Sequence, residues 1–436
     1  MIKYYKLFFI ISINTIILQS SFALDFKILQ KYTIENSKLL QISKLDIDIS
    51  KTQLDYINSD KYPTISIGVS AERSKGLSDD SSDSSYVGDN SVSSSSLYKT
   101  YSYLSLNYSL FDFGRLYYKT KSQTFDIETK KNDYCIEQNK ISQKLLDLYF
   151  NVRITEIKKQ YLDEILKYSN NLYQYYKRLH EIGNIQKTEV VTNAITVANL
   201  YNDISNNNKT YIENLEKLSN LSNFDLKTTN KLDSLSISKE IMNKRFEDTN
   251  LAKKYLNEIQ NKQAELDLIQ AQYYPQINLF GKYDFYGYDQ DSFSSSIDNF
   301  EENSYKYGLN ITWQIFDGFK IQAQEKKASH ELAQLNLKYE QAKIDFLTEL
   351  NILNKTHRFY SKIMEKNAKA LNLSDEKVDI ALRLNSIGEI DKSIEINSII
   401  KKLYTESEYK QAQETIAYKM MKKDIMLNGD DECIVH

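Results

Sequence analysis

The chain has 436 residues, with 56 lysines and arginines against 59 acidic residues, so it is long enough for two or three domains but offers no basic surface for nucleic acid. Only 11 glycines and 2 prolines accompany its 34 tyrosines, so the turn residues that a loop-rich enzyme fold requires are missing. Long, uninterrupted helices and strands are therefore predicted.

The first 23 residues have the features of a secretory signal peptide. Lys3 and Lys6 precede a mostly apolar stretch at 7–18, and residues 21–23 (Ser-Phe-Ala) provide a cleavage site. A membrane anchor needs about 20 apolar residues, which this stretch does not reach. We expect export and a mature chain that begins at Leu24. No later run of 18 apolar residues occurs, so any membrane-crossing segment is expected to be a strand.

The mature chain is predicted to contain two copies of one plan. Three short motifs recur in the same order: Tyr-Pro at 62–63 and 274–275, Phe-Asp with a following glycine at 111–114 and 316–318, and Ile-Gly at 182–183 and 387–388. The predicted boundaries are a first repeat at 24–224, a linking segment at 225–244, a second repeat at 245–424 and a polar C-terminal tail at 425–436. Such duplication indicates one structural unit used twice.

Each repeat is predicted to run helix, strand, strand, long helix and returning helix. The helices are expected at about 25–60, 113–182 and 185–222, then at 246–273, 318–386 and 390–424. Apolar residues at heptad spacing indicate that these helices pack on one another, and each long helix would extend roughly 100 Å. Gly183 and Gly388 suit the left-handed conformation at the bend between two antiparallel helices.

The strands are predicted from alternation of apolar and polar residues, at about 63–73 and 101–111, then at 275–288 and 304–316. Each has one apolar and one polar face, which fits either a half-buried soluble hairpin or a membrane barrel with a polar lumen. The loops at 78–96 and 289–303 are rich in serine and aspartate. We expect solvated linkers there, or the long external loops of a barrel.

The sequence contains no arrangement that predicts catalysis, a cofactor or a metal site. The four histidines are far apart, and no Gly-rich phosphate loop, nucleophile elbow or Cys-x-x-Cys occurs. The protein is therefore expected not to be an enzyme. Cys135 and Cys433 are 298 positions apart, one in a predicted helix and the other in the polar tail, so we do not expect a disulfide.

The duplicated order of these motifs resembles the TolC family of outer-membrane efflux proteins, over nearly all of the mature chain. The residues that carry the resemblance are the strand starts Pro63 and Pro275, the strand-to-helix junctions, and the breaks Gly183 and Gly388. The junction residues are Asp112, Gly114, Asp317 and Gly318. The resemblance implies an α+β membrane protein, a homotrimer whose four strands per chain close a 12-stranded β-barrel continued by a long α-helical coiled-coil barrel. The linking segment would lie in an equatorial collar.

The resemblance also implies a function and a location. Family members are passive exit ducts in the outer membrane of Gram-negative bacteria, extending into the periplasm, for efflux of small molecules or type I secretion of proteins. They work with a periplasmic adaptor protein and an inner-membrane transporter, and they contact outer-membrane lipid. The cargo is left open.

In this family the closed end of the duct lies at the helix turns, where acidic residues can ring the aperture. The matching segments are 183–194 and 388–397. Glu189 fits an acidic position six residues after Gly183, whereas the residue six after Gly388 is isoleucine. The candidates for gating or adaptor contact are Gly183, Glu189, Gly388, Asp391, Glu395 and Asn397.

An exported coiled-coil rod or adhesive fibre, with the β hairpins as soluble caps, is the alternative. It accounts for the leader and the heptads but not for two pairs of amphipathic strands long enough to cross a membrane. Dependence of the purified protein on detergent separates the two hypotheses.

Overall fold

The computed structural model describes residues 24–77, 94–228, 231–236, 244–428 and 433, so the predicted signal peptide lies outside the described residues. The chain divides into two compact units. The described parts of Met1–Ile42, Cys135–Thr249 and Asp345–His436 form the helical unit. Ser43–Tyr134 and Asn250–Ile344 form the strand unit.

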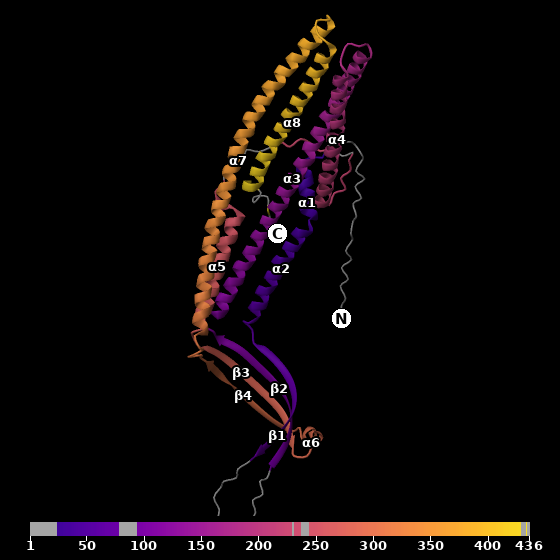
Figure 1. The fold of residues 1–436 in the computed structure, drawn as a ribbon. Helices are drawn as coiled ribbons and strands as arrows, with labels where there is room; N and C mark the ends of the chain where they lie inside the picture. Colours follow the sequence, from indigo (N-terminus) through magenta and orange to yellow (C-terminus); the bar gives the residue numbers. More distant parts are fainter. Residues whose placement is uncertain (1–23, 78–93, 229–230, 237–243, 429–432, 434–436) are drawn as a thin grey trace, which may run out of the picture. The chain divides into compact units, whose positions relative to one another are not determined.

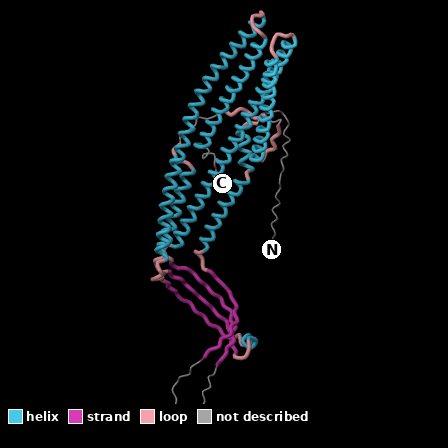
Figure 2. The backbone as a smooth tube through the Cα atoms, viewed as in Figure 1, coloured by secondary structure: helices cyan, strands magenta, loops and turns pink. Residues whose placement is uncertain are grey.

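The strand unit is built on one antiparallel sheet (Figures 1 and 2). Its strands are β1 (Thr64–Leu77), β2 (Ser94–Phe111), β3 (Gln276–Asp289) and β4 (Glu302–Thr312), hydrogen-bonded in chain order. Every strand thus pairs with its sequence neighbour, including β2 with β3 across the two repeats. Within the described residues, β1 and β4 are the two edges of the sheet.

Helices of the strand unit follow the same order as the strands. They belong to α2 (Lys38–Ser59), α3 (Arg115–Glu181), α5 (Asn250–Ala271) and α7 (Lys320–Ser386). Polar side chains join each helix to the next one in this order: Ser50 to Asp126 at 2.7 Å, Ser122 to Asn261 at 2.5 Å and Lys262 to Glu331 at 3.1 Å. Within the strand unit, the two repeats therefore lie side by side both in the sheet and among the helices.

A short helix, α6 (Phe293–Asp298), lies where the sequence predicted only a polar loop. Ser292 caps its first turn by accepting a hydrogen bond from the Ser295 amide, and Ser296 shares a 2.7 Å hydrogen bond with Thr100 of β2. Gly287 of β3 permits this approach, because a Cβ there would lie 2.1 Å from the Ser296 carbonyl oxygen.

The prediction for the last strand was wrong at its end, because β4 stops at Thr312 rather than 316. Thr312 pairs with Gln276, and the preceding Pro275 has no N–H to continue the ladder. Trp313 and Ile315 therefore lie beyond the strand and are largely exposed. The other edge of β4 has no neighbouring strand in the described chain that could extend it.

The helical unit contains α1 (Phe26–Asn36), α4 (Lys187–Ser222), α8 (Lys392–Asn428), the short 3-10 helix η1 (Phe246–Asp248) and the remaining parts of α2, α3 and α7. Its main core joins α1, α3, α4, α8 and the linking segment between the repeats. Tyr149 of α3 is fully buried at its centre and donates to the carbonyl oxygens of Leu24 (2.8 Å) and Asp233 (2.7 Å). The linking segment is thus fixed to the helices by a buried polar contact.

Two expected helix boundaries are corrected. The first helix, predicted as 25–60, is broken at Ser37, whose extended backbone ends α1 and whose hydroxyl accepts from the Leu40 amide at the start of α2. The last helix runs to Asn428 rather than 424, because Ile425 and Leu427 are buried. The predicted tail at 425–436 therefore begins later than expected.

Cys135 and Cys433 form a disulfide, which contradicts the prediction from the sequence. Cys135 lies on α3 and Cys433 follows the end of α8, and their Cα atoms are 5.7 Å apart. The two positions are distant in sequence but belong to the same unit, where α3 and α8 share a core. A separation of 298 residues leaves no local sequence pattern from which this pairing could be predicted.

Candidate functional site: the sheet, its junctions and the helix turns

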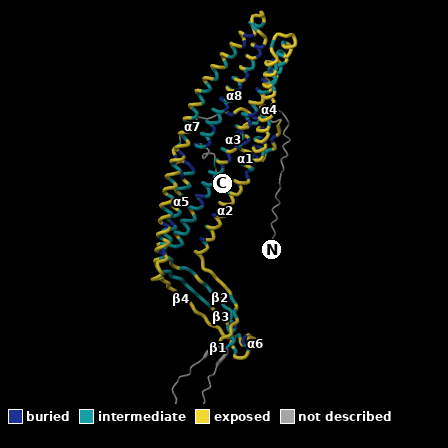
Figure 3. Tube along the Cα trace, in the orientation of Figure 1, coloured by how far each residue is buried: buried dark blue, intermediate teal, exposed yellow. Residues whose placement is uncertain are grey.

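The sheet of the strand unit has one apolar face, and that face is exposed. Side chains aligned across the four strands in register include Ile67 of β1, Leu104 of β2, Tyr283 of β3 and Tyr305 of β4. Ile67 is 81% exposed and Leu309 of β4 is 62% exposed. Figure 3 shows exposed residues along β1 and β4. An apolar surface of this extent marks contact with another protein or with lipid.

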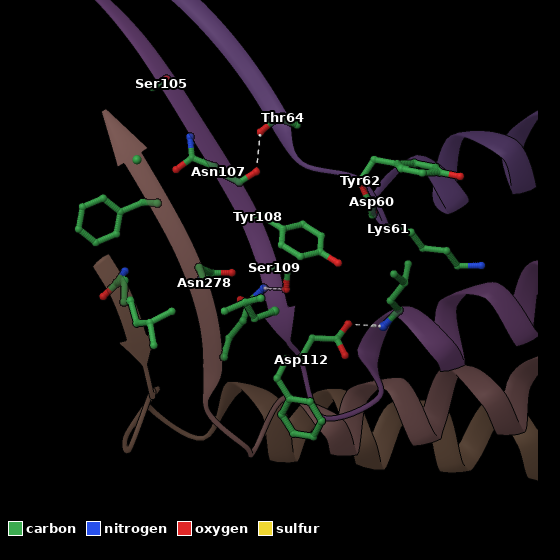
Figure 4. Close-up of a pocket in the computed structure, with 18 of the residues that line it drawn as sticks. Asp60, Lys61, Tyr62, Thr64, Ser105, Asn107, Tyr108, Ser109, Asp112 and Asn278 are labelled. Carbon is green, nitrogen blue, oxygen red and sulfur yellow. Dashed lines mark hydrogen bonds between the residues drawn. The ribbon is translucent and has the colours of Figure 1, made fainter. Parts of the chain in front are cut away.

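The opposite face is polar and hollowed. A cavity of about 1410 Å³ lies over it, lined by serine, threonine, asparagine and tyrosine side chains of the strands and by Lys282 and Lys306, together with some apolar side chains such as Phe280. In the close-up of Figure 4, Thr64 of β1 donates to the carbonyl oxygen of Asn107 on β2 at 3.3 Å. Ser109 of β2 and Asn278 of β3 lie beside them. The sheet therefore presents polar side chains that can bind water on one face and apolar side chains on the other.

Cationic side chains lie on the polar face. Lys282 of β3 pairs with Asp284 at 2.7 Å and lies 4.5 Å from the ring centre of Tyr103. Its cross-strand neighbour on β4 is Lys306, which lines the same cavity. The hollow therefore combines lysines with tyrosine rings, an arrangement that can hold water and polar solutes.

The junction aspartates Asp112 and Asp317 cap the two long helices. Asp112 accepts from the amides of Gly114 (3.0 Å) and Leu116 (2.6 Å). Asp317 accepts from the amides of Lys320 (3.1 Å) and Ile321 (2.7 Å). Each carboxylate satisfies amides that the first helical turn leaves without partners, and its charge suits the positive end of the helix dipole.

Two left-handed residues follow each capping aspartate. They are Phe113 (φ 55°) with Gly114 (φ 86°), and Gly318 (φ 68°) with Phe319 (φ 69°). One residue of each pair is glycine, which adopts positive φ without steric cost, but it is the second in one repeat and the first in the other. This explains why the motif reads Asp-Phe-Gly in one copy and Asp-Gly-Phe in the other.

Arg115, immediately after the first junction, holds the neighbouring helix-to-strand turn. Its guanidinium donates to the backbone carbonyl oxygens of Ala271 (3.2 Å), Gln272 (3.4 Å) and Tyr274 (2.7 Å). These carbonyls lie at the end of α5 and just before Pro275, which immediately precedes β3. Sequence reasoning did not assign Arg115 a role, although Arg115 and Lys320 occupy matching positions in the two junction motifs.

In the helical unit, Gly183 and Gly388 both end a long helix in the left-handed conformation, with φ of 79° and 77°. The amide after each glycine donates to the carbonyl five residues back, Asn184 to Leu179 at 2.8 Å and Glu389 to Leu384 at 2.9 Å. This is the Schellman arrangement, in which glycine has no Cβ penalty. The two turns are therefore alike in backbone.

The candidate side chains at these turns differ in environment. Glu189 is exposed on the first turn of α4, and Asn397 is exposed on the second turn of α8. Glu395 is buried and accepts from Asn385 at 2.5 Å and from Lys392, so its charge is occupied within its own hairpin. Asp391 caps α8 by accepting from the Ser393 amide at 2.8 Å.

Asp391 also links the two helical hairpins, which the sequence did not predict. Tyr175 of α3 donates to its carboxylate at 2.6 Å. Burial acts to raise the pKa of Asp391, but the hydrogen bonds from Ser393 and Tyr175 outweigh it and hold that pKa below its ordinary value. The same bond raises the pKa of Tyr175 to about 12.

Within the described parts of the chain, no cluster of histidine, cysteine and carboxylate side chains is placed to hold a metal ion. None of the described helices combines the length and apolar composition that crossing a membrane requires.

Comparison with known proteins identifies the class. The family profile described as outer membrane efflux protein matches residues 29–223 and 253–378. The chain belongs to this family, and it is accordingly a protein of the outer membrane. No curated protein sequence matches the chain significantly. The alternative of a structural fibre has no support in these comparisons.

Solved outer-membrane channels share the fold. The outer-membrane channel OprN superposes with a TM-score of 0.78 at 15% identity, covering 93% of this chain and 90% of that one. The CmeC channel of Campylobacter jejuni gives 0.76 at 14%, covering 93% and 86%. The open-state MtrE channel of Neisseria gonorrhoeae gives 0.72 at 15%, covering 92% and 88%.

Proposed function

We propose that three copies of this chain close a 12-stranded barrel in the outer membrane and act as a passive exit duct. The observation that carries the proposal is the single sheet with an exposed apolar face, a hollow polar face and two strand edges. Four strands cannot close alone, since about eight are needed for a barrel, and an open edge in lipid leaves backbone groups unsatisfied. Further copies resolve both problems.

The proposed duct is completed by partners that supply energy and connection. The long helices continue the barrel into the periplasm, where an adaptor protein would join them to an inner-membrane transporter. Residues 1–23 would direct export and be removed. The linking segment at 225–244 would contribute to a collar around the helices. The cargo is a small molecule or a secreted protein.

The test is the mass of detergent-purified protein together with conductance in a planar bilayer. We expect a trimer that needs detergent to stay in solution and that inserts as discrete pores. A detergent-independent species without conductance would overturn the proposal and favour the fibre.

We further propose that the helix turns close the duct, with Glu189, Asp391, Glu395 and Asn397 around the aperture or at the adaptor contact. The bond from Tyr175 to Asp391 supports closure because it fastens one hairpin to the other. Glu395 contributes by fixing its own hairpin rather than by offering a free charge. Gly183 and Gly388 form the backbone of the turns.

Replacing Tyr175 by phenylalanine is therefore expected to increase the open fraction of single channels while leaving the trimer intact. Tyr176→Phe, one position along, is the matched control and should leave gating unchanged. A lowered carboxyl pKa gives stability that is present above the ordinary value of 3.8 and lost only as pH falls through the lower folded pKa. The Tyr175 hydroxyl stays protonated until pH nears 12, so the difference should persist from about pH 5 to 9. Equal open fractions for Tyr175→Phe and Tyr176→Phe would contradict a role of the Tyr175–Asp391 hydrogen bond in gating.

A further inference from the structure

The two repeats enter their sheets through turns with the same hydrogen bonds. At the end of α2, the amides of Asp60, Lys61 and Tyr62 donate three residues back, to Ile57, Asn58 and Ser59. At the end of α5, the amides of Gln272, Tyr273 and Tyr274 donate in the same way to Ile269, Gln270 and Ala271. Every position in the second turn is 212 residues after its counterpart. The two turns are therefore structural equivalents.

The two segments that lead from the sheet into a long helix, here called exits, are equivalent as well. The first joins β2 to α3 and the second joins β4 to α7, and matching residues are 205 positions apart. The capping aspartates Asp112 and Asp317, the left-handed pairs and the following cations Arg115 and Lys320 correspond one to one. Within one chain the first exit meets the second turn, because β2 pairs with β3 and Arg115 donates to the carbonyls of that turn. This contact within the chain shows how the segment after one strand can bind the helix-to-strand turn of the next strand in the sheet.

The other combination cannot form within one chain. The second exit follows β4 and the first turn precedes β1, and these strands are the opposite edges of the sheet. We propose that the β4 edge pairs with the β1 edge of a second copy in the register of β2 with β3, and that Lys320 binds the Ser59–Tyr62 turn of that copy. The proposal rests on the proposed function and specifies its subunit interface.

The register follows from the equivalence. Leu106 of β2 pairs with Gly281 of β3, and their equivalents are Ile311 and Val69. The observed pair of Leu104 with Tyr283 predicts that Leu309 pairs with Ala71 of the next copy. The observed pair of Ser105 with Lys282 predicts in the same way that Asn310 pairs with Ser70. The two derived pairs on the apolar face, Ile311 with Val69 and Leu309 with Ala71, join apolar residues. The derived pair on the polar face, Asn310 with Ser70, joins polar ones. A slip by one residue would place polar residues on the apolar face.

Two features of the free chain agree with this interface. The expected strand at 304–316 stops at Thr312, and the proposed register sets residues 313–316 opposite the start of β1 in the next copy, so β4 can be completed there. Ile49 of α2 is 65% exposed, and its equivalent Asn261 is the α5 residue that bonds to Ser122 of α3. Ile49 is therefore exposed in the free chain at the position whose equivalent in the second repeat, Asn261, contacts the neighbouring helix α3. A neighbouring copy could cover Ile49 in the same way.

Lysine is expected to make a weaker contact than arginine at this place. Arg115 reaches three carbonyl oxygens with a planar fork, whereas the ammonium of Lys320 is a compact group on a flexible stem. Lys320→Arg should therefore raise the temperature at which the detergent-solubilised trimer dissociates, and Lys320→Ala should lower it. The exposed Lys326→Ala, on the same helix, is the control and should leave that temperature unchanged.

Paired cysteines test the register. Ile311→Cys with Val69→Cys, and Asn310→Cys with Ser70→Cys, sample the two kinds of antiparallel pair, one on each face. Oxidation with copper phenanthroline should link copies covalently in at least one of these double variants. Ile311→Cys with Ile67→Cys is the control, because a slip of two residues moves the partner about 7 Å along the strand, beyond disulfide reach. Single-cysteine variants exclude links through Cys135 and Cys433.

The outcomes separate the two proposals. Covalent oligomers from the predicted pairs, with the control unlinked, support the register. A trimeric mass with links only in the control pair, or with neither predicted pair linked, overturns the register and leaves the trimer standing. A monomeric mass in detergent overturns both. Identical dissociation temperatures for Lys320→Arg, Lys320→Ala and the parent contradict the role of Lys320.

Discussion

Replacing Arg153 by methionine is expected to destabilise the helical unit by about 3–5 kcal/mol at pH 8, since breaking a buried ion pair leaves its partner charges uncompensated. Arg153 of α3 contacts Glu156 at 2.8 Å and Glu414 of α8 at 3.6 Å. All three side chains are largely buried, and the Glu414 side chain is 6% exposed. Without the guanidinium, two carboxylates would face each other in the interior.

The loss should be smaller at pH 5. Burial raises the pKa of Glu156 and Glu414 above the ordinary value of 4.5, although Arg153 and backbone hydrogen bonds act in the opposite direction. When a folded carboxyl pKa is raised, the native state binds more protons than the unfolded state at pH between the two values. Stability therefore falls as pH rises through this window. Removing Arg153 raises both pKa values further, so the variant should be the more pH-dependent protein.

Thermal unfolding of detergent-solubilised protein, followed by far-UV circular dichroism at pH 5 and pH 8, measures this prediction. Adding Glu414→Gln to Arg153→Met should restore part of the stability at pH 8, because one buried charge is removed while an acceptor for the Leu235 amide remains. Lys209→Met is the matched control, since its ion pair with Glu213 is exposed and worth less than about 1 kcal/mol. A loss for Arg153→Met that is equal at both pH values would contradict the buried-charge explanation.

The architecture could be predicted from the sequence because its signals are local and occur twice. Period-two alternation near Ile67 and Tyr305 marks strands, and the scarcity of glycine and proline elsewhere marks long helices. The motifs at Pro63, Asp112 and Gly183, with their copies, place the turns between elements. The structure supplies the physical reason for the Phe-Asp motif, which is a helix cap followed by two left-handed residues.

Contacts between distant positions could not be predicted in this way. Arg115 acts on carbonyls about 156 to 159 residues away, and Tyr175 reaches Asp391 across 216 positions. Neither pairing leaves a periodic pattern in the chain. The early end of β4 has a related cause, since a strand extends only where a neighbour accepts its hydrogen bonds. Glu395, selected from its charge, is engaged by Asn385 and Lys392, and composition alone does not reveal such partners.

Replacing Cys433 by serine is expected to destabilise the helical unit by about 2–4 kcal/mol, the usual effect of losing a native disulfide. The bond joins α3 to the segment after α8 and closes a long loop of the chain, so its loss enlarges the unfolded ensemble and releases the end of α8. Unfolding midpoints at fixed protein concentration, with and without dithiothreitol, measure the effect. The reductant should lower the midpoint of the parent to that of Cys433→Ser.

The serine variants contain their own control for this bond. Cys135→Ser, Cys433→Ser and the double variant should unfold at similar temperatures, because each removes the same link and the effects of contacting residues do not add. Dithiothreitol should change none of the three. Reaction of the unfolded parent with maleimide before reduction would show free thiols and contradict the disulfide. Additive losses in the double variant would mean instead that the two side chains stabilise the fold separately, through packing at α3 and at the end of α8.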